Sequence, residues 1–163
     1  MIFTVAYRNM PNFKAVLVAI ISFFLFGCAA SGPKFNGLES LKFDSSEIVV
    51  YRPDRFARGG VKYLLHLDGR EAASLQNAGF TTISASPGKH EIEIHASAFH
   101  NFKPMKVSVN AKPGARAFLR FEPSSGGPPV VLPTAIYIPV AFDFEEIPEA
   151  QALIELQDLR RSE

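Results

Sequence analysis

From Glu47 to Phe144 the chain alternates apolar and polar residues in short runs. The run HEIEIHA, residues 90–96, puts its isoleucines on one face of an extended strand and its glutamates on the other. Because successive side chains of a β-strand point to opposite faces, a period of two predicts strands with one buried and one wetter face. The 12 prolines and 11 glycines that interrupt these runs favour short strands joined by turns over a helical bundle.

About seven to eight such segments follow one another at roughly ten-residue spacing, which is typical of a small all-β domain. Asp68-Gly69 predicts a tight hairpin, and Pro87-Gly88 and Pro113-Gly114 predict two more. We expect a flexible loop at EPSSGGPP, residues 122–129, and an edge or bulge at Pro139. The expected strands are 47–53, 61–67, 70–75, 80–86, 90–96, 105–111, 116–122 and 135–144.

The period changes near the C-terminus. In IPEAQALIELQDLRR the leucines recur at close to helical spacing, Pro148 stands where a first helical residue is tolerated, and Arg160 and Arg161 follow near the end. These features predict a helix over residues 148–161 that packs on the sheet or on its open edge. The sequence therefore predicts one mainly β domain over residues 47–163, a small antiparallel β-sandwich with one C-terminal helix.

The first 27 residues have the layout of a secretory signal. A start that carries Arg8 and Lys14 is followed by the apolar run AVLVAIISFFLF, residues 15–26, and then by the small residues GCAA. At 12 residues, this run is shorter than the roughly 20 apolar residues that cross a bilayer as a helix. We expect residues 1–27 to be a signal peptide. Met10 begins a compact basic start of its own and is a second candidate for the initiator.

The four residues Leu25, Phe26, Gly27 and Cys28 resemble the lipobox of bacterial lipoproteins. In that family a branched apolar residue stands three positions before a cysteine, and a small residue directly precedes it. The resemblance implies cleavage before Cys28 and attachment of a diacylglycerol to its thiol. Phe26 departs from the small residue usual at its position, which implies slower cleavage. Ala29 stands where aspartate is associated with inner-membrane retention, which favours the outer membrane.

Cys28 is the only cysteine of the chain, so it cannot form an internal disulfide. A buried thiol in an N-terminal core helix is the alternative to lipid attachment. If Cys28 is acylated, several acyl chains anchor the protein stably in the membrane. The residues that follow are mostly small and polar, so we expect residues 28–46 to comprise the lipidated cysteine and a flexible tether.

Four motifs stand in order along the domain: Tyr51-Arg52-Pro53, Asp68-Gly69, Gly79-Phe80 and Pro87-Gly88-Lys89-His90. Their order behind a lipobox resembles a β-sandwich domain of unknown function found in Gram-negative lipoproteins and, more loosely, PEGA-type surface β-domains. The resemblance covers roughly residues 47–122. It implies a compact sandwich and brings no catalytic residues.

The charge balance argues against a nucleic-acid partner. The formal net charge is +1, and residues 28–163 hold 15 basic and 16 acidic side chains. Binding of nucleic acid needs a concentrated basic face, which such a balance does not favour. The sequence contains neither a G-x-G-x-x-G motif nor a P-loop, so we expect no nucleotide cofactor.

His90, His95 and His100 lie at five-residue intervals. An odd spacing puts His90 and His95 on opposite faces of one strand, so the two cannot share a metal ion without a bulge, although His66 can join either across the sheet. Solvated histidines on wet faces are the simpler interpretation. An envelope hydrolase or metal-handling protein that uses His66, His90 or His95 is the alternative function.

A nucleophile triad can be drawn from Ser84 or Ser97 with His95 and Asp68. No G-x-S-x-G motif presents a serine on the sharp turn that such a nucleophile needs. We therefore expect no catalytic residues.

Two loops carry the residues that we expect to contact a partner. YRPDRFARGG interleaves arginines with aromatic rings, and FHNFKPM, residues 99–105, is a second aromatic loop. Guanidinium groups and aromatic faces bind acidic groups, sugars or a partner chain. The simpler alternative for the first loop is an exposed basic loop between two strands. For the second loop it is that both phenylalanines are buried in the core at a corner of the sheet. If both loops lie at one end of the sandwich, they form one binding rim. The candidates are Arg52, Arg55, Phe56, Arg58, Phe99 and Phe102.

The sequence thus predicts a non-enzymatic lipoprotein of the bacterial cell envelope, held by acyl chains on Cys28. We expect it at the outer membrane more than the inner, on the periplasmic face or at the surface. Its β-sandwich is expected to bind an envelope protein or a glycan. A purely structural role in an envelope complex is a third alternative.

Overall fold

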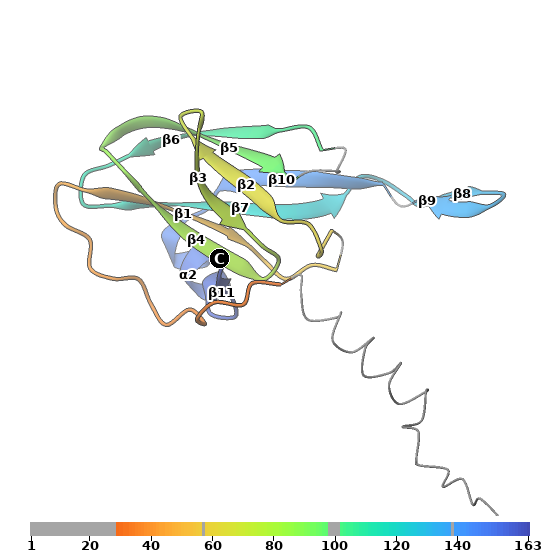
Figure 1. The fold of residues 1–163 in the computed structure, drawn as a ribbon, viewed down its shortest axis with the longest axis horizontal. Coiled ribbons are helices and arrows are strands. Elements are labelled where there is room, and N and C mark those ends of the chain that lie inside the picture. The colour runs from red at the N-terminus through yellow and green to blue at the C-terminus, as the bar shows by residue number, and fades with distance from the viewer. Residues whose placement is uncertain (1–28, 57, 98–101, 138) are drawn as a thin grey trace, which may run out of the picture.

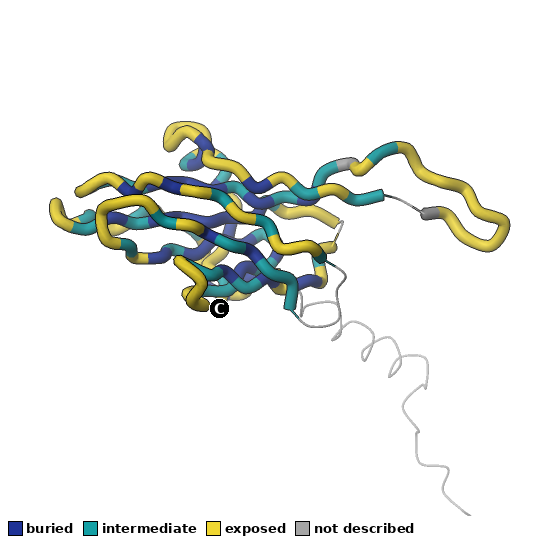
Figure 2. Tube along the Cα trace, turned by 90° about the horizontal axis from the view of Figure 1, so that it is seen from above, coloured by how far each residue is buried: buried dark blue, intermediate teal, exposed yellow. Residues whose placement is uncertain are grey.

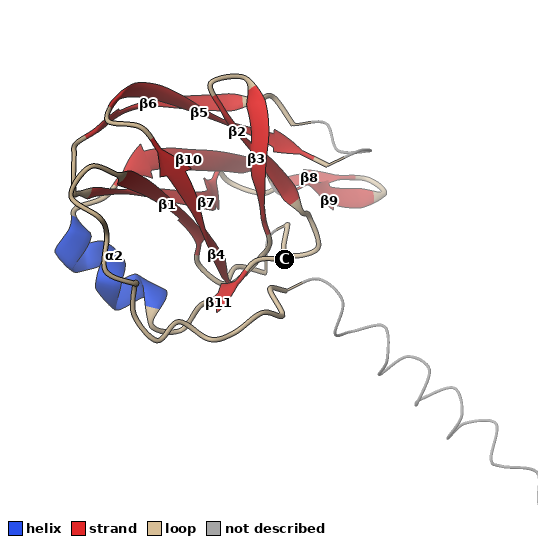
Figure 3. Ribbon diagram, turned by 60° about the vertical axis from the view of Figure 1, so that its left-hand side comes forward, coloured by secondary structure: helices blue, strands red, loops and turns tan. Residues whose placement is uncertain are grey.

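Two β-sheets pack face to face, and one helix lies on the outer side of the larger sheet (Figures 1 and 3). The computed structural model describes residues 29–56, 58–97, 102–137 and 139–163. The first sheet has the strand order β10 (Val140–Glu146), β7 (Arg116–Ser125), β1 (Ser46–Arg52), β4 (Gly79–Ala85) and β11 (Arg160–Arg161). The second has the order β3 (Arg70–Leu75), β2 (Tyr63–Leu67), β5 (Gly88–Ala96) and β6 (Met105–Ala111). A separate hairpin consists of β8 (Val130–Leu132) and β9 (Ala135–Tyr137).

The predicted mainly β sandwich is confirmed, but its pairing is mixed and not wholly antiparallel. β1 runs parallel to β7, and β11 runs parallel to β4. Every other strand pair among the described residues is antiparallel. A tight turn cannot join parallel neighbours, so β1 and β7 meet only after the chain has built the whole second sheet between them.

β1 is the centre of the fold because both of its faces are buried. Ile48 and Val50 point into the core between the two sheets. Val49 and Tyr51 point the other way, into a second core under the helix. The continuous apolar run of this strand follows from its position, since a strand covered on both sides has no wet face.

One of the three predicted hairpins is confirmed. Leu67 pairs with Arg70 across the Asp68-Gly69 turn, which joins β2 to β3. Both turn residues have positive φ, 50° at Asp68 and 79° at Gly69, as the tight turn of a two-residue hairpin requires.

The hairpins predicted at Pro87-Gly88 and Pro113-Gly114 are wrong, because each turn carries the chain from one sheet to the other. β4 pairs with β1, whereas β5 pairs with β2 and β6. β6 pairs with β5, whereas β7 pairs with β1 and β10. Ile83 before the first turn and Ile92 after it enter the same core from opposite sheets. Alternation identifies the buried face of a strand, but it does not identify the partner strand.

Helix α2 (Glu149–Leu156) is shorter than the predicted 148–161. Pro148 is the N-cap, one position before the helix, and not its first residue as predicted. Ala152 and Leu156 are fully buried against the outer face of the five-stranded sheet (Figure 3). The helix ends after Leu156, so the two arginines that we placed in its last turn lie outside it.

Those arginines form β11, which completes the edge of the larger sheet. The Arg160 N–H donates to the carbonyl of Ala78 (3.0 Å), and the Ser162 N–H donates to that of Phe80 (2.8 Å). Leu159 is buried in the core under the helix. Pairing with the open edge of β4 thus satisfies backbone groups that a longer helix would have bonded internally.

The segment predicted as a flexible tether is paired with the domain over residues 29–35. The Ala30 N–H donates to the carbonyl of Asn77 (2.9 Å), and the Phe35 N–H donates to that of Leu159 (2.9 Å). The tether prediction is wrong for this stretch, because small and polar residues also suit a chain that lies along a sheet edge.

Residues 122–144 also differ from expectation. β7 continues through Ser125, so half of the predicted loop is strand. The strand predicted over residues 135–144 is divided between β9 and β10, and β8 and β9 project from the sandwich (Figure 1). Ile136, which we expected on a buried face, is exposed. Ile138 lies outside the described residues.

Candidate functional site

Both predicted binding loops lie at one end of the sandwich. Tyr51 pairs with Arg120, so parallel strands β1 and β7 run toward the same end, where the loop after β1 begins. The Ser97 N–H donates to the carbonyl of Lys62 (3.0 Å), which brings the end of β5 to the same place. We call this end, with residues 53–56, 58–62, 76–79, 102–104, 126–137 and 139, the loop end.

Arg52 belongs to the interior and not to the binding rim. Its side chain is fully buried, and it donates to the carbonyls of Val61 (2.9 Å) and Arg58 (2.7 Å). Its guanidinium also lies 5.1 Å from the ring centroid of Tyr63. Burial lowers the pKa of Arg52 from its usual value. The prediction of a binding role is therefore wrong for Arg52. Its guanidinium instead fixes the loop after β1 through the carbonyls of Arg58 and Val61.

Phe102 is also turned inward, in agreement with the alternative of a core plug. Its ring packs edge-on against Tyr63 (5.2 Å between centroids) and Phe142 (5.1 Å). Phe102 is half-buried and also lines a pocket with Lys103 and Val140, so its predicted binding role stays a prediction. Phe99 lies outside the described residues.

Three of the candidates are exposed at the loop end. Phe56 is fully exposed, and Arg58 adopts a positive φ of 59° on the surface. Arg55 is exposed and forms an ion pair with Glu122 on β7 (2.8 Å). Among the described residues, Arg55, Phe56 and Arg58 are the members of the predicted rim that are fully on the surface.

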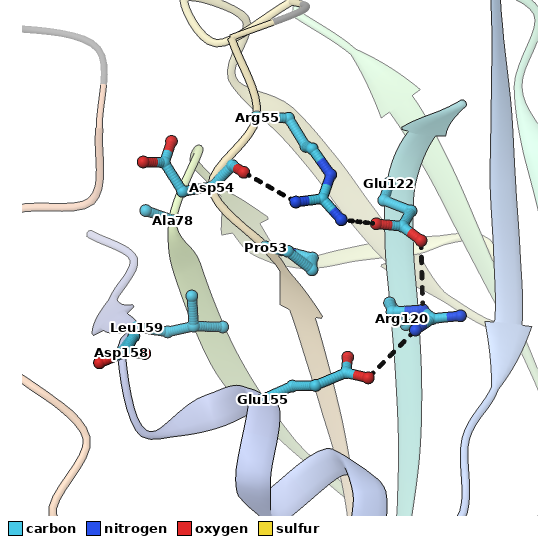
Figure 4. Close-up of a pocket in the computed structure, with 9 residues that line it drawn as sticks. All are labelled: Pro53, Asp54, Arg55, Ala78, Arg120, Glu122, Glu155, Asp158 and Leu159. Atoms are coloured by element: carbon cyan, nitrogen blue, oxygen red, sulfur yellow. Dashed lines mark hydrogen bonds and ion pairs between the residues drawn. The ribbon is translucent and has the colours of Figure 1, made fainter. Parts of the chain in front are cut away.

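Arg55 forms one wall of a pocket of about 490 Å³ between β1, β7 and the end of α2 (Figure 4). Arg120 and Glu122 project from β7, and Glu155 projects from the helix toward Arg120. The pocket combines an apolar floor with fixed charges. Its lining is Pro53, Asp54, Arg55, Ala78, Arg120, Glu122, Glu155, Asp158 and Leu159.

Arg120 is the centre of the ionic network in this pocket. Its guanidinium lies 2.7 Å from Glu145 and 3.1 Å from Glu155. Burial opposes the charge of Arg120, but the hydrogen bond to Glu145 and the charges of Glu155 and Glu122 outweigh it, so the pKa of Arg120 is raised. Burial and the hydrogen bond that Tyr51 donates to Glu155 (2.8 Å) raise the pKa of Tyr51, which stays neutral. Such paired groups suit recognition by fixed charges better than proton transfer.

Sequence reasoning missed Arg120, Glu122 and Glu155. In RAFLRFE, Arg120 and Glu122 alternate with apolar residues, which marks an outward face. Glu155 reaches that face only through the packing of α2 on the sheet. Alternation in the sequence predicts the outward face of β7, but it does not predict that α2 packs beside that face.

His66 and His95 lie side by side on the outer face of the four-stranded sheet. Their ring centroids are 4.4 Å apart, and Glu93 lies 3.3 Å from His95 Nε2. Ser84 belongs to the other sheet and faces away from His95, so the triad drawn with Ser84 does not assemble. Within the described ranges, no group of three or more histidine, cysteine, aspartate or glutamate side chains could hold a metal ion.

Asp68, His90 and Ser86 form a line that resembles a catalytic triad only superficially. His90 Nδ1 lies 2.7 Å from Asp68 Oδ2, and His90 Nε2 lies 3.5 Å from Ser86 Oγ but 2.7 Å from the Ser86 carbonyl oxygen. A carbonyl only accepts, so Nε2 carries a proton, while Nδ1 donates to Asp68. These two hydrogen bonds raise the pKa of His90. A His90 ring that donates from both nitrogens cannot accept the Ser86 hydroxyl proton. Its two hydrogen bonds instead connect the residues on either side of the Pro87-Gly88 turn with Asp68.

This pair makes the stability of the domain depend on pH. Because the pKa of His90 is raised in the folded chain, its interaction with Asp68 adds stability that is complete below pH 6.5, the ordinary pKa of histidine. This stability is lost as the pH rises through the pKa that His90 has in the folded chain. The pKa of Asp68 is lowered, first by the Glu91 N–H and then by His90, so its contribution is complete above the ordinary 3.8 and is lost as pH falls through the folded value. We expect His90→Gln to lower Tm most between these two ordinary values. Thermal unfolding in a pH series tests this, and a loss that is equal at all pH values, or unchanged by Asp68→Asn, would contradict it.

The residues of the predicted lipobox, Leu25 to Cys28, lie outside the described residues, so lipid attachment stays a prediction. No helix within the part that the structure describes is long and apolar enough to cross a membrane. Comparisons with protein-family models, curated proteins and solved structures give no match to this chain.

Proposed function

We propose that this chain is a lipid-anchored, non-enzymatic binding module of the bacterial cell envelope, attached through Cys28. The observation that carries the proposal is the order of basic start, short apolar run and LFGC at residues 25–28. Acylation at Cys28 would place the sandwich at a membrane surface, with the outer membrane favoured by Ala29. The partner is an envelope protein or a glycan.

The position of Ala29 supports this proposal. Ala29 bridges Asn77, which lies two residues before β4 begins at Gly79, at the loop end. An acyl group on the preceding residue would therefore be next to the folded domain, with no long linker between them. The loop end would then face the membrane, and the pocket around Arg55 and Arg120 would open beside it.

The chemistry of that pocket supports binding over catalysis. Arg55, Glu122, Arg120 and Glu155 form a chain of ion pairs across it, at 2.8, 3.6 and 3.1 Å in that order. Side chains fixed in this way present a defined pattern of charge to a partner without reorganising. A segment that offers its own acidic and basic groups fits such a pattern.

Crosslinking in intact cells tests the binding role. We expect one abundant adduct from the wild-type chain, reduced about tenfold by Arg55→Glu, which corresponds to about 1.4 kcal/mol of binding free energy. Lys89→Glu makes the same charge change at the exposed second residue of strand β5, far from the loop end, and should leave the adduct unchanged. Equal adducts from both variants, or no wild-type adduct, would argue for a purely structural role.

A further inference from the structure

The β8–β9 hairpin projects from the loop end, and its residues 130–136 are exposed to solvent (Figure 2). Val131 is 77% exposed and Ile136 is 68% exposed, and Val130 and Leu132 are exposed by about half. No residue from Pro123 to Phe142 carries a charge. An exposed apolar surface of this kind usually marks an interaction site.

The β8–β9 hairpin is poorly suited to full exposure to water. An isolated two-stranded hairpin is marginally stable in water, and proteins protect exposed strand edges with charged side chains such as lysine. Residues 130–137 have no such charge. The hairpin therefore requires an apolar contact that its own domain does not supply.

The hydrocarbon core of a bilayer is excluded as well, because the outer edges of β8 and β9 are open. Unpaired backbone groups cannot be satisfied there. The interface between headgroups and acyl chains meets both requirements, since it offers apolar contact and hydrogen-bonding partners. At about 3.3 Å per residue, the three-residue strands reach about 10 Å, which matches the depth to which interfacial segments are buried.

The position of the hairpin points to the same place. Phe56, which is fully exposed, lines a shallow pocket together with Ala29 and Asn77. Ala29 follows Cys28 directly, and β7 ends in the hairpin at the same end of the sandwich. Two apolar projections, at Phe56 and at residues 130–136, thus lie at the end of the sandwich where the chain would meet its acyl chains.

The charges around this end suit an anionic lipid surface. Arg58 and Lys103 are exposed there, and such cations are attracted to anionic headgroups, whereas the exposed Lys62 donates to the main-chain oxygen of Glu163 (2.9 Å). The neighbouring acids are engaged within the protein, since Asp54 accepts from Asn77 (2.6 Å) and Glu122 pairs with Arg55.

We infer that the β8–β9 hairpin and Phe56 insert into the headgroup region of the lipid bilayer beside Cys28, which fixes the orientation of the sandwich on the membrane. This inference rests on the proposed acylation of Cys28. A second copy of the chain or a protein partner would also cover the hairpin, but neither accounts for its place at the end of the sandwich where Ala29 bridges Asn77.

A single tryptophan tests the inference, because the chain has none of its own. Acylated full-length Val131→Trp is reconstituted into vesicles of phosphatidylethanolamine and phosphatidylglycerol, with or without brominated phosphatidylcholine. We expect a blue-shifted emission that loses most of its intensity in the brominated vesicles. The control is Phe43→Trp, at an exposed residue beside Gly114 on the opposite end, which should emit as in water and stay unquenched.

The outcomes separate the two proposals. Acyl mass on the purified chain and flotation with the vesicles test the lipid anchor alone. If the anchored protein floats and Val131→Trp emits as in water, the insertion is disproved while the anchor stands. A blue shift without bromolipid quenching would also overturn insertion, because it would place the hairpin in a protein contact.

Discussion

Replacing Cys28 with serine is expected to move nearly all of the protein from the membrane fraction to the soluble fraction. Each buried methylene of an acyl chain contributes roughly 0.8 kcal/mol, so the loss of two or three chains changes membrane partition by many orders of magnitude. The hairpin is too short to replace them, since it offers only two three-residue strands. Fractionation of cells after a high-salt wash measures the change.

The matched control for this variant is Ser31→Ala, an equally small change at an exposed residue three positions later. It should leave the protein with the membranes. Unchanged membrane retention of Cys28→Ser, together with an unmodified wild-type thiol, would refute attachment through this residue.

The second large effect is on stability. Arg52→Met should lower the free energy of unfolding by about 3 kcal/mol, because it keeps the apolar stem but leaves two carbonyls without their donor. Those carbonyls belong to Val61 and Arg58, and the bond to Val61 is fully buried. Urea unfolding of the purified chain measures the loss.

The control for Arg52→Met is Arg55→Met, which removes an exposed arginine from the same loop. Exposed ion pairs contribute about 0–1 kcal/mol, so this variant should unfold close to the wild type. Arg52→Lys separates charge from geometry, since one ammonium cannot reproduce the planar fork that serves two carbonyls. Wild-type stability in Arg52→Met would contradict the structural role of this side chain.

The parts of the fold that depend on local pattern were predictable. Alternation in HEIEIHA gave the correct buried face, because Ile92 and Ile94 are fully buried. Asp68-Gly69 gave a real hairpin because its two positive φ angles are local chemistry. The Pro-Gly turns did not, since a turn between strands has the same residues whether the strands share a sheet or face each other across a core.

The candidate site was less predictable, because long-range packing decides which side chains are free. YRPDRFARGG identifies three arginines, and nothing in the sequence tells that Arg52 finds two carbonyls while Arg55 finds a carboxylate on β7. Phe102 and Phe56 have the same side chain, yet one fills the gap between the sheets and the other is fully exposed. The pocket joins residues from four separate segments, and only the folded chain brings them together.

The most direct test of the proposed function is the mass of the N-terminal peptide of the protein purified from bacterial membranes. We predict a peptide that begins at Cys28 and carries the added mass of a diacylglycerol, with or without a further acyl group on its amine. A peptide that begins at Met1 or Met10, with Cys28 present as an unmodified thiol, would contradict lipid attachment and with it the proposed place of this protein on the membrane.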